Sequence, residues 1–252
     1  MSFALPAEAY DRFMGVHSRQ LAPQLVDLAR LASGDRALDV GCGPGALTTE
    51  LVTRLGAGSV AAVDPSESFV VAARARHTGV DVRRASAEGL PYADRVFDAG
   101  LAQLVVHFMT DPVAGLREMA RVTRSEGSIV ACVWDHAGER TPVSTFWRAA
   151  RDLGLTTRDE SALAGARRGH LVELFKGSGL RHVEDAVLVA RVKYSSFDEW
   201  WKPFSHGVGP AGAAYLALTP DQKGHLRERW KALLPPAPFE LASFAWAARG
   251  MV

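Results

Sequence analysis

The segment Leu38-Asp39-Val40-Gly41-Cys42-Gly43-Pro44-Gly45 decides the fold of this chain of 252 residues. The run 37–40, apolar except for Asp39, predicts a strand, and residues 47–55 have the apolar spacing of a helix. Three glycines between a strand and a helix let a ligand lie against the backbone at the carboxyl edge of a sheet. A nucleotide-like cofactor is the ligand that such a loop favours.

The glycines alone do not select the cofactor, because residues 41–46 also match the dinucleotide pattern G-x-G-x-x-A. Asp39 stands two residues before the first glycine. A carboxylate there can accept an ammonium group, whereas it repels a pyrophosphate. Asp39 therefore favours a cofactor that carries an amino acid.

Apolar runs of strand length alternate with amphipathic stretches of helix length on both sides of this loop. Strands are expected at 37–40, 60–63, 80–83, 97–102, 128–134, 183–194 and 241–248, and helices at 21–32, 47–55, 66–77, 111–123 and 144–153. The alternation predicts an α/β fold with a Rossmann-like, doubly wound sheet of seven strands, parallel except for an antiparallel C-terminal strand. Five strand–helix units are expected by residue 155.

An aromatic-rich helical segment separates the last two predicted strands, and Thr219-Pro220-Asp221-Gln222 is a capping box that predicts a helix start. A helical insertion that leaves a parallel strand at its carboxyl end emerges at the edge of the glycine loop. We therefore expect residues 196–235 to form a helical lid that covers the active site. The expected core spans 35–195 and 236–252, and residues 1–34 form an N-terminal helical cap segment.

The composition favours a small-molecule partner. Apolar residues make up 48% and charged residues 23%, and 29 Lys plus Arg against 28 Asp plus Glu leave a net charge of +1. This balance produces no electrostatic field that would attract nucleic acid or an anionic membrane. The sequence also has no apolar run that predicts a membrane span. The two cysteines show no metal-ligand spacing, and residues 1–8 lack a basic, apolar leader, so we expect a cytoplasmic protein without a metal.

Five segments between residues 10 and 135 resemble the class I S-adenosylmethionine-dependent methyltransferases, in the group related to the quinone-biosynthesis C-methyltransferases. Residues 37–48 resemble the first motif, which surrounds the methionine part of the cofactor; the matching residues are Asp39, Gly41, Cys42, Gly43 and Gly45. Residues 61–66 resemble the second motif. There the acidic residue takes both ribose hydroxyls, which implies this role for Asp64, followed by Pro65 and Ser66.

Residues 85–92 resemble the family segment Gly-Asp-Ala-Glu-x-Leu-Pro-Phe, whose Asp bonds the adenine amine. Here Ser86 stands at that position, followed by Ala87 and Glu88, and a hydroxyl still accepts one hydrogen bond there. Residues 97–108 resemble the fourth motif and the loop beside the sulfonium, which singles out Gln103 and His107. Residues 10–19 resemble a segment that closes over the cofactor in a subgroup, which adds Tyr10 and Arg19.

The resemblance implies S-adenosylmethionine as cofactor and methyl transfer, by in-line displacement, to an O, N or C atom of a small organic acceptor. His107 or Tyr10 would receive a proton where the acceptor loses one, although a histidine in an apolar stretch is also expected of a core residue. The aromatic residues of the insertion indicate an apolar or ring-bearing acceptor, and they also suit plain helix packing. A silent S-adenosylmethionine-binding regulatory protein and a nicotinamide-dependent oxidoreductase remain as alternatives.

Overall fold

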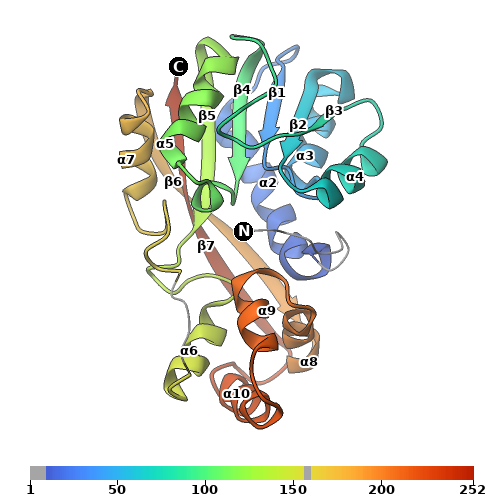
Figure 1. Ribbon diagram of the computed structural model, residues 1–252, viewed down its shortest axis with the longest axis vertical. Helices are drawn as coiled ribbons and strands as arrows, with labels where there is room; N and C mark the ends of the chain where they lie inside the picture. The colour runs from blue at the N-terminus through green and yellow to red at the C-terminus, as the bar shows by residue number, and fades with distance from the viewer. Residues whose placement is uncertain (1–9, 156–159) are drawn as a thin grey trace.

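The carboxyl ends of five parallel strands form one edge of a seven-stranded sheet in the computed structural model, which describes residues 10–155 and 160–252 (Figure 1). The strand order is β3-β2-β1-β4-β5-β7-β6, and β7 runs antiparallel to both β5 and β6. This confirms the predicted doubly wound sheet with an antiparallel C-terminal strand. The strands are β1 (Ala37–Val40), β2 (Val60–Asp64), β3 (Asp81–Arg84), β4 (Phe97–Gln103), β5 (Thr123–Trp134), β6 (Arg181–Tyr194) and β7 (Phe239–Met251).

Helices cover both faces of the sheet because its central strands are apolar on both sides. One face packs against α2 (Val16–Ala29), α3 (Ala46–Leu55) and α4 (Glu67–Arg76). The other face packs against α5 (Pro112–Val122) and α7 (His170–Gly177). The Asp111 side chain accepts from the Ala114 N–H at the start of α5, which is the cap expected before Pro112.

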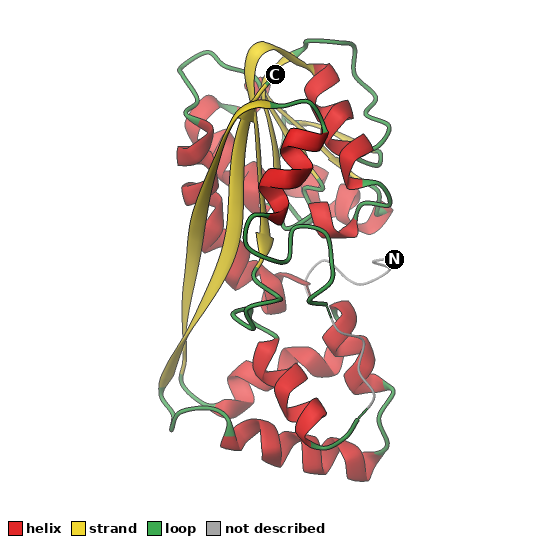
Figure 2. Cartoon of the chain, turned by 90° about the vertical axis from the view of Figure 1, so that its left-hand side faces the viewer, coloured by secondary structure: helices red, strands yellow, loops and turns green. Residues whose placement is uncertain are grey.

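The last two strands extend beyond the rest of the sheet. Pairing of β5 with β7 ends at Trp134 and Ala245, whereas β6 and β7 pair onward to Tyr194 and Phe239. Figure 2 shows this two-stranded ribbon reaching from the core to a separate group of helices. Since β6 and β5 are both antiparallel to β7, β6 leaves the sheet at the same edge as the glycine loop.

The ribbon carries the insertion helices, by which we mean α8 (Phe197–Trp201), η4 (Lys202–His206), α9 (Gly209–Leu216) and α10 (Pro220–Ala232). The capping box at Thr219 and Gln222 starts α10 as predicted. A fully buried Trp230 lies at the centre, with ring centroids 4.4 Å from Trp200 and 4.5 Å from Phe204. Its indole N–H donates to the Thr145 hydroxyl at 3.0 Å.

Several helices differ from the sequence prediction. The helix predicted at 144–153 forms as α6 (Ser144–Asp152), but it packs against α10 and the aromatic cluster instead of covering the sheet (Figure 1). The short helix α7 takes that place and was not predicted. A π-helical turn, η1 (Asp11–Gly15), also precedes α2, which begins at Val16 and therefore earlier than the predicted residue 21.

We expect Trp230→Ala to lower the free energy of unfolding by about 3–5 kcal/mol, because a large buried ring is lost and leaves a cavity. Urea unfolding followed by circular dichroism measures this change. Val71→Ala is the control, since Val71 is 56% exposed and the change should cost at most about 0.5 kcal/mol. Equal stability of the two variants would contradict the central role of Trp230.

A candidate binding site at the carboxyl edge of the sheet

The glycine loop connects β1 to α3 in a narrow space. The N–H groups of Gly41 and Cys42 both donate to the Val63 carbonyl, at 2.8 and 2.9 Å. Gly41 has φ +72°, and a Cβ there would lie 2.4 Å from Val105 Cγ2. Gly45 has φ +100°, and its Cβ would lie 2.4 Å from His77 Nε2. Only glycine fits these two positions. The loop backbone can therefore lie directly against Val105 and His77 at the strand ends.

Gly43 differs from its neighbours because its free side faces open space. It has φ +54°, and a Cβ there would meet nothing within 4 Å. Its N–H donates to Asp64 Oδ2 at 2.9 Å, and the Ser66 N–H donates to Asp64 Oδ1 at 2.8 Å. The Asp64 carboxylate is therefore fixed between the two loops, and each oxygen keeps a further lone pair for a ligand.

Asp39 is a buried carboxyl group whose two oxygens differ in their hydrogen bonding. Oδ2 accepts from the Thr48 hydroxyl at 2.6 Å, whereas Oδ1 has no hydrogen-bond partner within the described part of the chain. Burial, with a smaller effect of the Asp64 charge, raises the pKa of Asp39 to about 7. An unpaired buried oxygen is costly, so this atom indicates a ligand that donates hydrogen bonds.

The N-terminal segment lies beside the glycine loop. Arg76 joins them, because its Nη1 donates to the Pro44 carbonyl at 2.8 Å while its Nη2 contacts Asp11 Oδ2 at 2.5 Å. Gln103, at the end of β4, donates from Nε2 to the Ser18 carbonyl at 3.1 Å. Its Oε1 is buried without a partner among the residues described. Arg19 is exposed on α2 next to this contact.

The loop after β3 contains Ser86, which is expected at the adenine, and Ala87 and Glu88, which are also expected at the cofactor. Ser86 is exposed, and Ala87 is buried. Glu88 Oε1 accepts from the N–H groups of Thr110 and Asp111, at 2.7 and 3.3 Å, so it holds the segment that follows β4. This loop therefore lies near the strand ends, and the hydrogen bonds of Glu88 stabilise the segment that follows β4.

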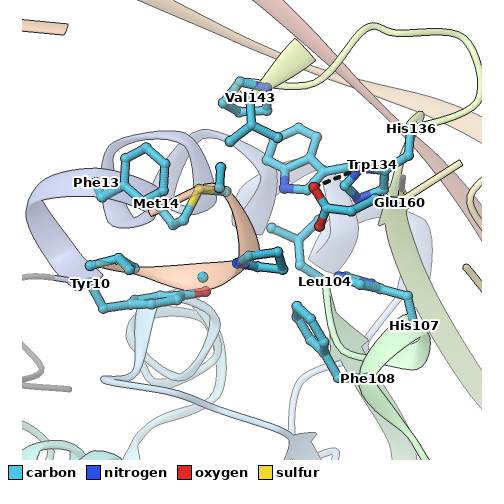
Figure 3. Close-up of a pocket in the computed structure, with 15 residues that line it drawn as sticks. Tyr10, Phe13, Met14, Leu104, His107, Phe108, Trp134, His136, Val143 and Glu160 are labelled. Atoms are coloured by element: carbon cyan, nitrogen blue, oxygen red, sulfur yellow. Dashed lines mark ion pairs between the residues drawn. The ribbon is translucent and has the colours of Figure 1, made fainter. Parts of the chain in front are cut away.

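A largely apolar cavity lies between the strand ends and the insertion helices (Figure 3). We call it the apolar cavity; its walls include Tyr10, Phe13, Met14, Leu104, Phe108, Val143 and Val208, and its polar members are His107, Trp134, His136 and Glu160. Tyr10 and His107, which the sequence singled out, therefore meet in one cavity although 97 positions separate them in the chain.

Both of these residues have shifted pKa values. Burial and the neighbouring His136, whose ring centroid lies 5.6 Å away, lower the pKa of His107 well below its usual range. Burial, followed by the charge of Asp64, raises the pKa of Tyr10 to about 12. At neutral pH the imidazole and the phenol are therefore both uncharged.

Sequence analysis missed Trp134, His136 and Glu160. Glu160 Oε2 accepts from the Trp147 indole N–H at 2.7 Å and lies 3.9 Å from His136 Nδ1. Only 8% of the Glu160 side chain is exposed. Its neighbours in the sequence are polar and show no period, so nothing local distinguishes this glutamate from a surface residue.

Two further expectations from the sequence are that the chain has no metal site and no membrane span. In residues 10–155 and 160–252, no group of three or more His, Cys, Asp or Glu side chains is placed to hold a metal ion. No helix in the same ranges is long and apolar enough to cross a membrane. Cys42 and Cys132 are both free and buried.

Comparisons with known proteins agree on one family. Residues 38–131 match the family model described as a methyltransferase domain. A malonyl-[acyl-carrier protein] O-methyltransferase of Erwinia billingiae is 31% identical over 222 residues, which cover 79% of this chain and 87% of the relative. A demethylmenaquinone methyltransferase of Mycolicibacterium vanbaalenii is 41% identical over 192 residues, covering 75% of this chain and 79% of the relative.

A solved structure shows the same fold. A protein of Bacillus halodurans superposes with a TM-score of 0.61 at 16% identity, covering 91% of this chain and 97% of the other. At this identity the likeness concerns the fold alone.

We expect Gly41→Ala to destabilise the protein by about 2–5 kcal/mol, because a positive φ costs about 1–2 kcal/mol for alanine and overlap with Val105 adds about 1–3 kcal/mol. Gly43→Ala is the matched variant. It meets open space and should cost only about 1–2 kcal/mol. Thermal unfolding without ligand measures both, and a larger loss for Gly43→Ala would refute this account of the loop.

Proposed function

Because the chain belongs to the family of S-adenosylmethionine-dependent methyltransferases and moves a methyl group to a small acceptor, we propose that the glycine loop binds the cofactor and the apolar cavity binds the acceptor. The family assignment decides against the nicotinamide-dependent oxidoreductase and the silent binding protein. The observation that carries the proposal is the adjacency of the two sites. Leu104 and His107, directly after β4, line the cavity, and the neighbouring Val105 packs against Gly41 of the loop.

The residues at the glycine loop fit this cofactor. The unpaired Asp39 Oδ1 suits its ammonium group, and Asp64, with spare lone pairs on both oxygens, suits two ribose hydroxyls. The open side of Gly43 leaves room for the cofactor's backbone contact. The other residues assigned to the cofactor are Gly41, Cys42, Gly45, Pro65, Ser66, Ser86, Ala87, Glu88, Gln103 and Arg19.

S-adenosylmethionine supplies a methyl group on a sulfonium, whose leaving group is a neutral thioether. The protein therefore has mainly to align the acceptor with the methyl group and to exclude water. Phe13, Phe108 and Val208 bring apolar surface from three distant parts of the chain to one cavity. These walls orient an acceptor by packing and leave little room for solvent.

The walls also support an apolar or ring-bearing acceptor. Among the described residues that line the cavity, none is a lysine or an arginine. A carboxylate acceptor, such as the malonyl group named for the Erwinia relative, would lack a counterion there. An uncharged ring, such as that of the demethylmenaquinone named for the Mycolicibacterium relative, suits these walls better.

The division of the chain follows from the same arrangement. We assign residues 1–34 to an N-terminal cap segment, of which residues 1–9 lie outside the described residues, 35–195 and 236–252 to the core, and 196–235 to the insertion over the acceptor. The separate aromatic core around Trp230 supports this division, and α6 joins that core from outside the insertion. The free, buried cysteines support a reducing compartment such as the cytoplasm.

Thermal unfolding with S-adenosylhomocysteine tests the cofactor site. A ligand at about 100 times its Kd adds about 2.7 kcal/mol, which should raise the midpoint by about 5–10 °C, and NAD should leave it unchanged. Asp64→Ala should weaken binding on the order of 100-fold because hydrogen bonds to a charged group are lost. His107→Ala is the control and should keep the affinity within about threefold, as expected for a residue of the acceptor side.

The affinity for S-adenosylhomocysteine should rise with pH on the order of tenfold per unit from about pH 5.5 to 7. The raised pKa of Asp39, about 7, keeps the carboxyl protonated at low pH, and only the carboxylate pairs with an ammonium group. Asp39→Asn should bind weakly at every pH without this slope. Calorimetric titration measures both proteins, and a slope that persists in Asp39→Asn would refute the assignment.

A further inference from the structure

Trp134 has a buried N–H group without a partner. It is the last residue of β5 and is only 3% exposed. Its indole Nε1 has no hydrogen-bond partner within the described part of the chain. The ring lines the apolar cavity, and Figure 3 shows it between Val143 and Leu104. An unpaired donor therefore lies in the wall of the proposed acceptor site.

This donor differs from the other indole groups of the chain. Four of them donate their N–H to a side-chain oxygen at 2.7–3.0 Å; these belong to Trp147, Trp201, Trp230 and Trp246. An indole nitrogen can only donate, and a buried donor without a partner costs free energy. A phenylalanine would fill an apolar wall without that cost. The unpaired N–H at position 134 therefore indicates a ligand that brings the missing oxygen or nitrogen atom.

The backbone and the ring of Trp134 are both held in place. The backbone pairs with Ala245 of β7, and the ring of His17 packs edge-on against the indole, with the centroids 6.2 Å apart. His17 does not supply the missing acceptor atom, because its Nε2 contacts the Tyr194 hydroxyl at 3.1 Å and its Nδ1 has no partner among the described residues. The indole therefore has a fixed position in the cavity wall.

A second polar atom of the same cavity also lacks a partner. His107 Nδ1 is buried without a hydrogen bond to any residue that the structure describes. Burial lowers the pKa of His107 well below its usual range, so the imidazole is neutral and has one N–H and one lone pair. Two unpaired polar atoms in a largely apolar cavity indicate a ligand that is apolar over most of its surface and polar at a few points.

The end of β5 is connected to the loop that contacts the cofactor side. The Leu104 N–H donates to the Cys132 carbonyl at 2.9 Å, two residues before Trp134. The residue after Leu104 is Val105, which packs against Gly41. An atom that is hydrogen-bonded to the Trp134 N–H therefore lies at a fixed place relative to the glycine loop, as the alignment of a methyl transfer requires.

We propose that Trp134 determines the specificity of the acceptor site by donating its indole N–H to a carbonyl or ether oxygen of the ring-bearing acceptor; this rests on the proposed function. No proton moves and no bond breaks in this contact, which selects and orients the acceptor. An acceptor with such an oxygen forms a hydrogen bond that a hydrocarbon of the same shape cannot form.

Two probes of the same shape test this contact. They are 2-acetylnaphthalene, which has a carbonyl oxygen, and 2-isopropenylnaphthalene, which has a methylene group in its place. Each is titrated calorimetrically into the full chain, with and without S-adenosylhomocysteine. The ratio of the two Kd values, alkene over ketone, cancels the contribution of the shared ring. This ratio should fall about 5-fold to 50-fold in Trp134→Phe, because the variant keeps an aromatic ring and loses the N–H.

Trp201→Phe is the matched control. It makes the same chemical change at a tryptophan whose N–H donates to Asp198 at 2.8 Å and which is not among the described residues that line the apolar cavity. It should keep the wild-type ratio within about twofold. A purely structural role of Trp134 would weaken both probes alike and leave the ratio unchanged.

NMR of the indole N–H groups gives a second readout on the wild-type protein. The Trp134 signal should move further downfield with the ketone than with the alkene, because a hydrogen bond deshields the proton. The signal is assigned by its loss in Trp134→Phe, or by its contacts with the ring of His17 if that variant does not fold.

The outcomes separate this inference from the proposed function. An unchanged ratio in Trp134→Phe, or an indole signal that responds to both probes alike, overturns the role of Trp134 and leaves the ring-bearing acceptor standing. Failure of both probes on a protein that binds S-adenosylhomocysteine overturns the inference and the proposed acceptor class together. A fall in the ratio on a protein that does not bind S-adenosylhomocysteine supports the role of Trp134 and overturns only the placement of the cofactor.

Discussion

The close approach of the glycine loop to the ends of the neighbouring strands is the constraint on which the site depends. Gly41 lies against Val105 of the loop after β4, and both Gly41 and Cys42 donate to Val63 of β2. The turn therefore joins three strand ends in one place. A side chain at position 41 would push the β1 and β4 ends apart, and with them the cofactor and acceptor sites that lie on either side.

The two sites are built in different ways. The cofactor side comes from residues at or near the carboxyl end of each strand, so the sheet alone places Asp39, Asp64 and Gln103. The apolar cavity combines the N-terminal segment, the loop after β4, the loop after β5 and the insertion. The β6–β7 ribbon makes this possible, because it carries α9 back over the carboxyl edge, where Val208 completes the wall.

This difference explains how much the sequence predicts. The strands, the Asp111 cap and the capping box at Thr219 depend on local patterns, and the structure confirms them. The helix α7 has only eight residues and glycine on both sides, so its period is too short to detect. The position of α6 depends on Thr145 and Phe146 meeting Trp230, which follows 84 residues after Phe146, and no local pattern contains such a contact. Glu160 was missed for the same reason.

Three buried carboxyl groups lie along the proposed path of the methyl group, and a positive charge travels with that group. Asp39 and Asp64 stand at the cofactor end, and Glu160 stands at the acceptor end. Burial raises the pKa values of the first two, so the folded chain holds these protons more tightly than the unfolded chain does and becomes less stable as pH rises through that range. In the folded chain without a ligand, the charged forms of Asp39 and Asp64 are therefore less stable than in the unfolded chain. A cation beside Asp39 would stabilise the buried carboxylate, and this gain in free energy would contribute to the binding affinity. That is a physical reason for a protein of this family to keep charged groups in an otherwise apolar core.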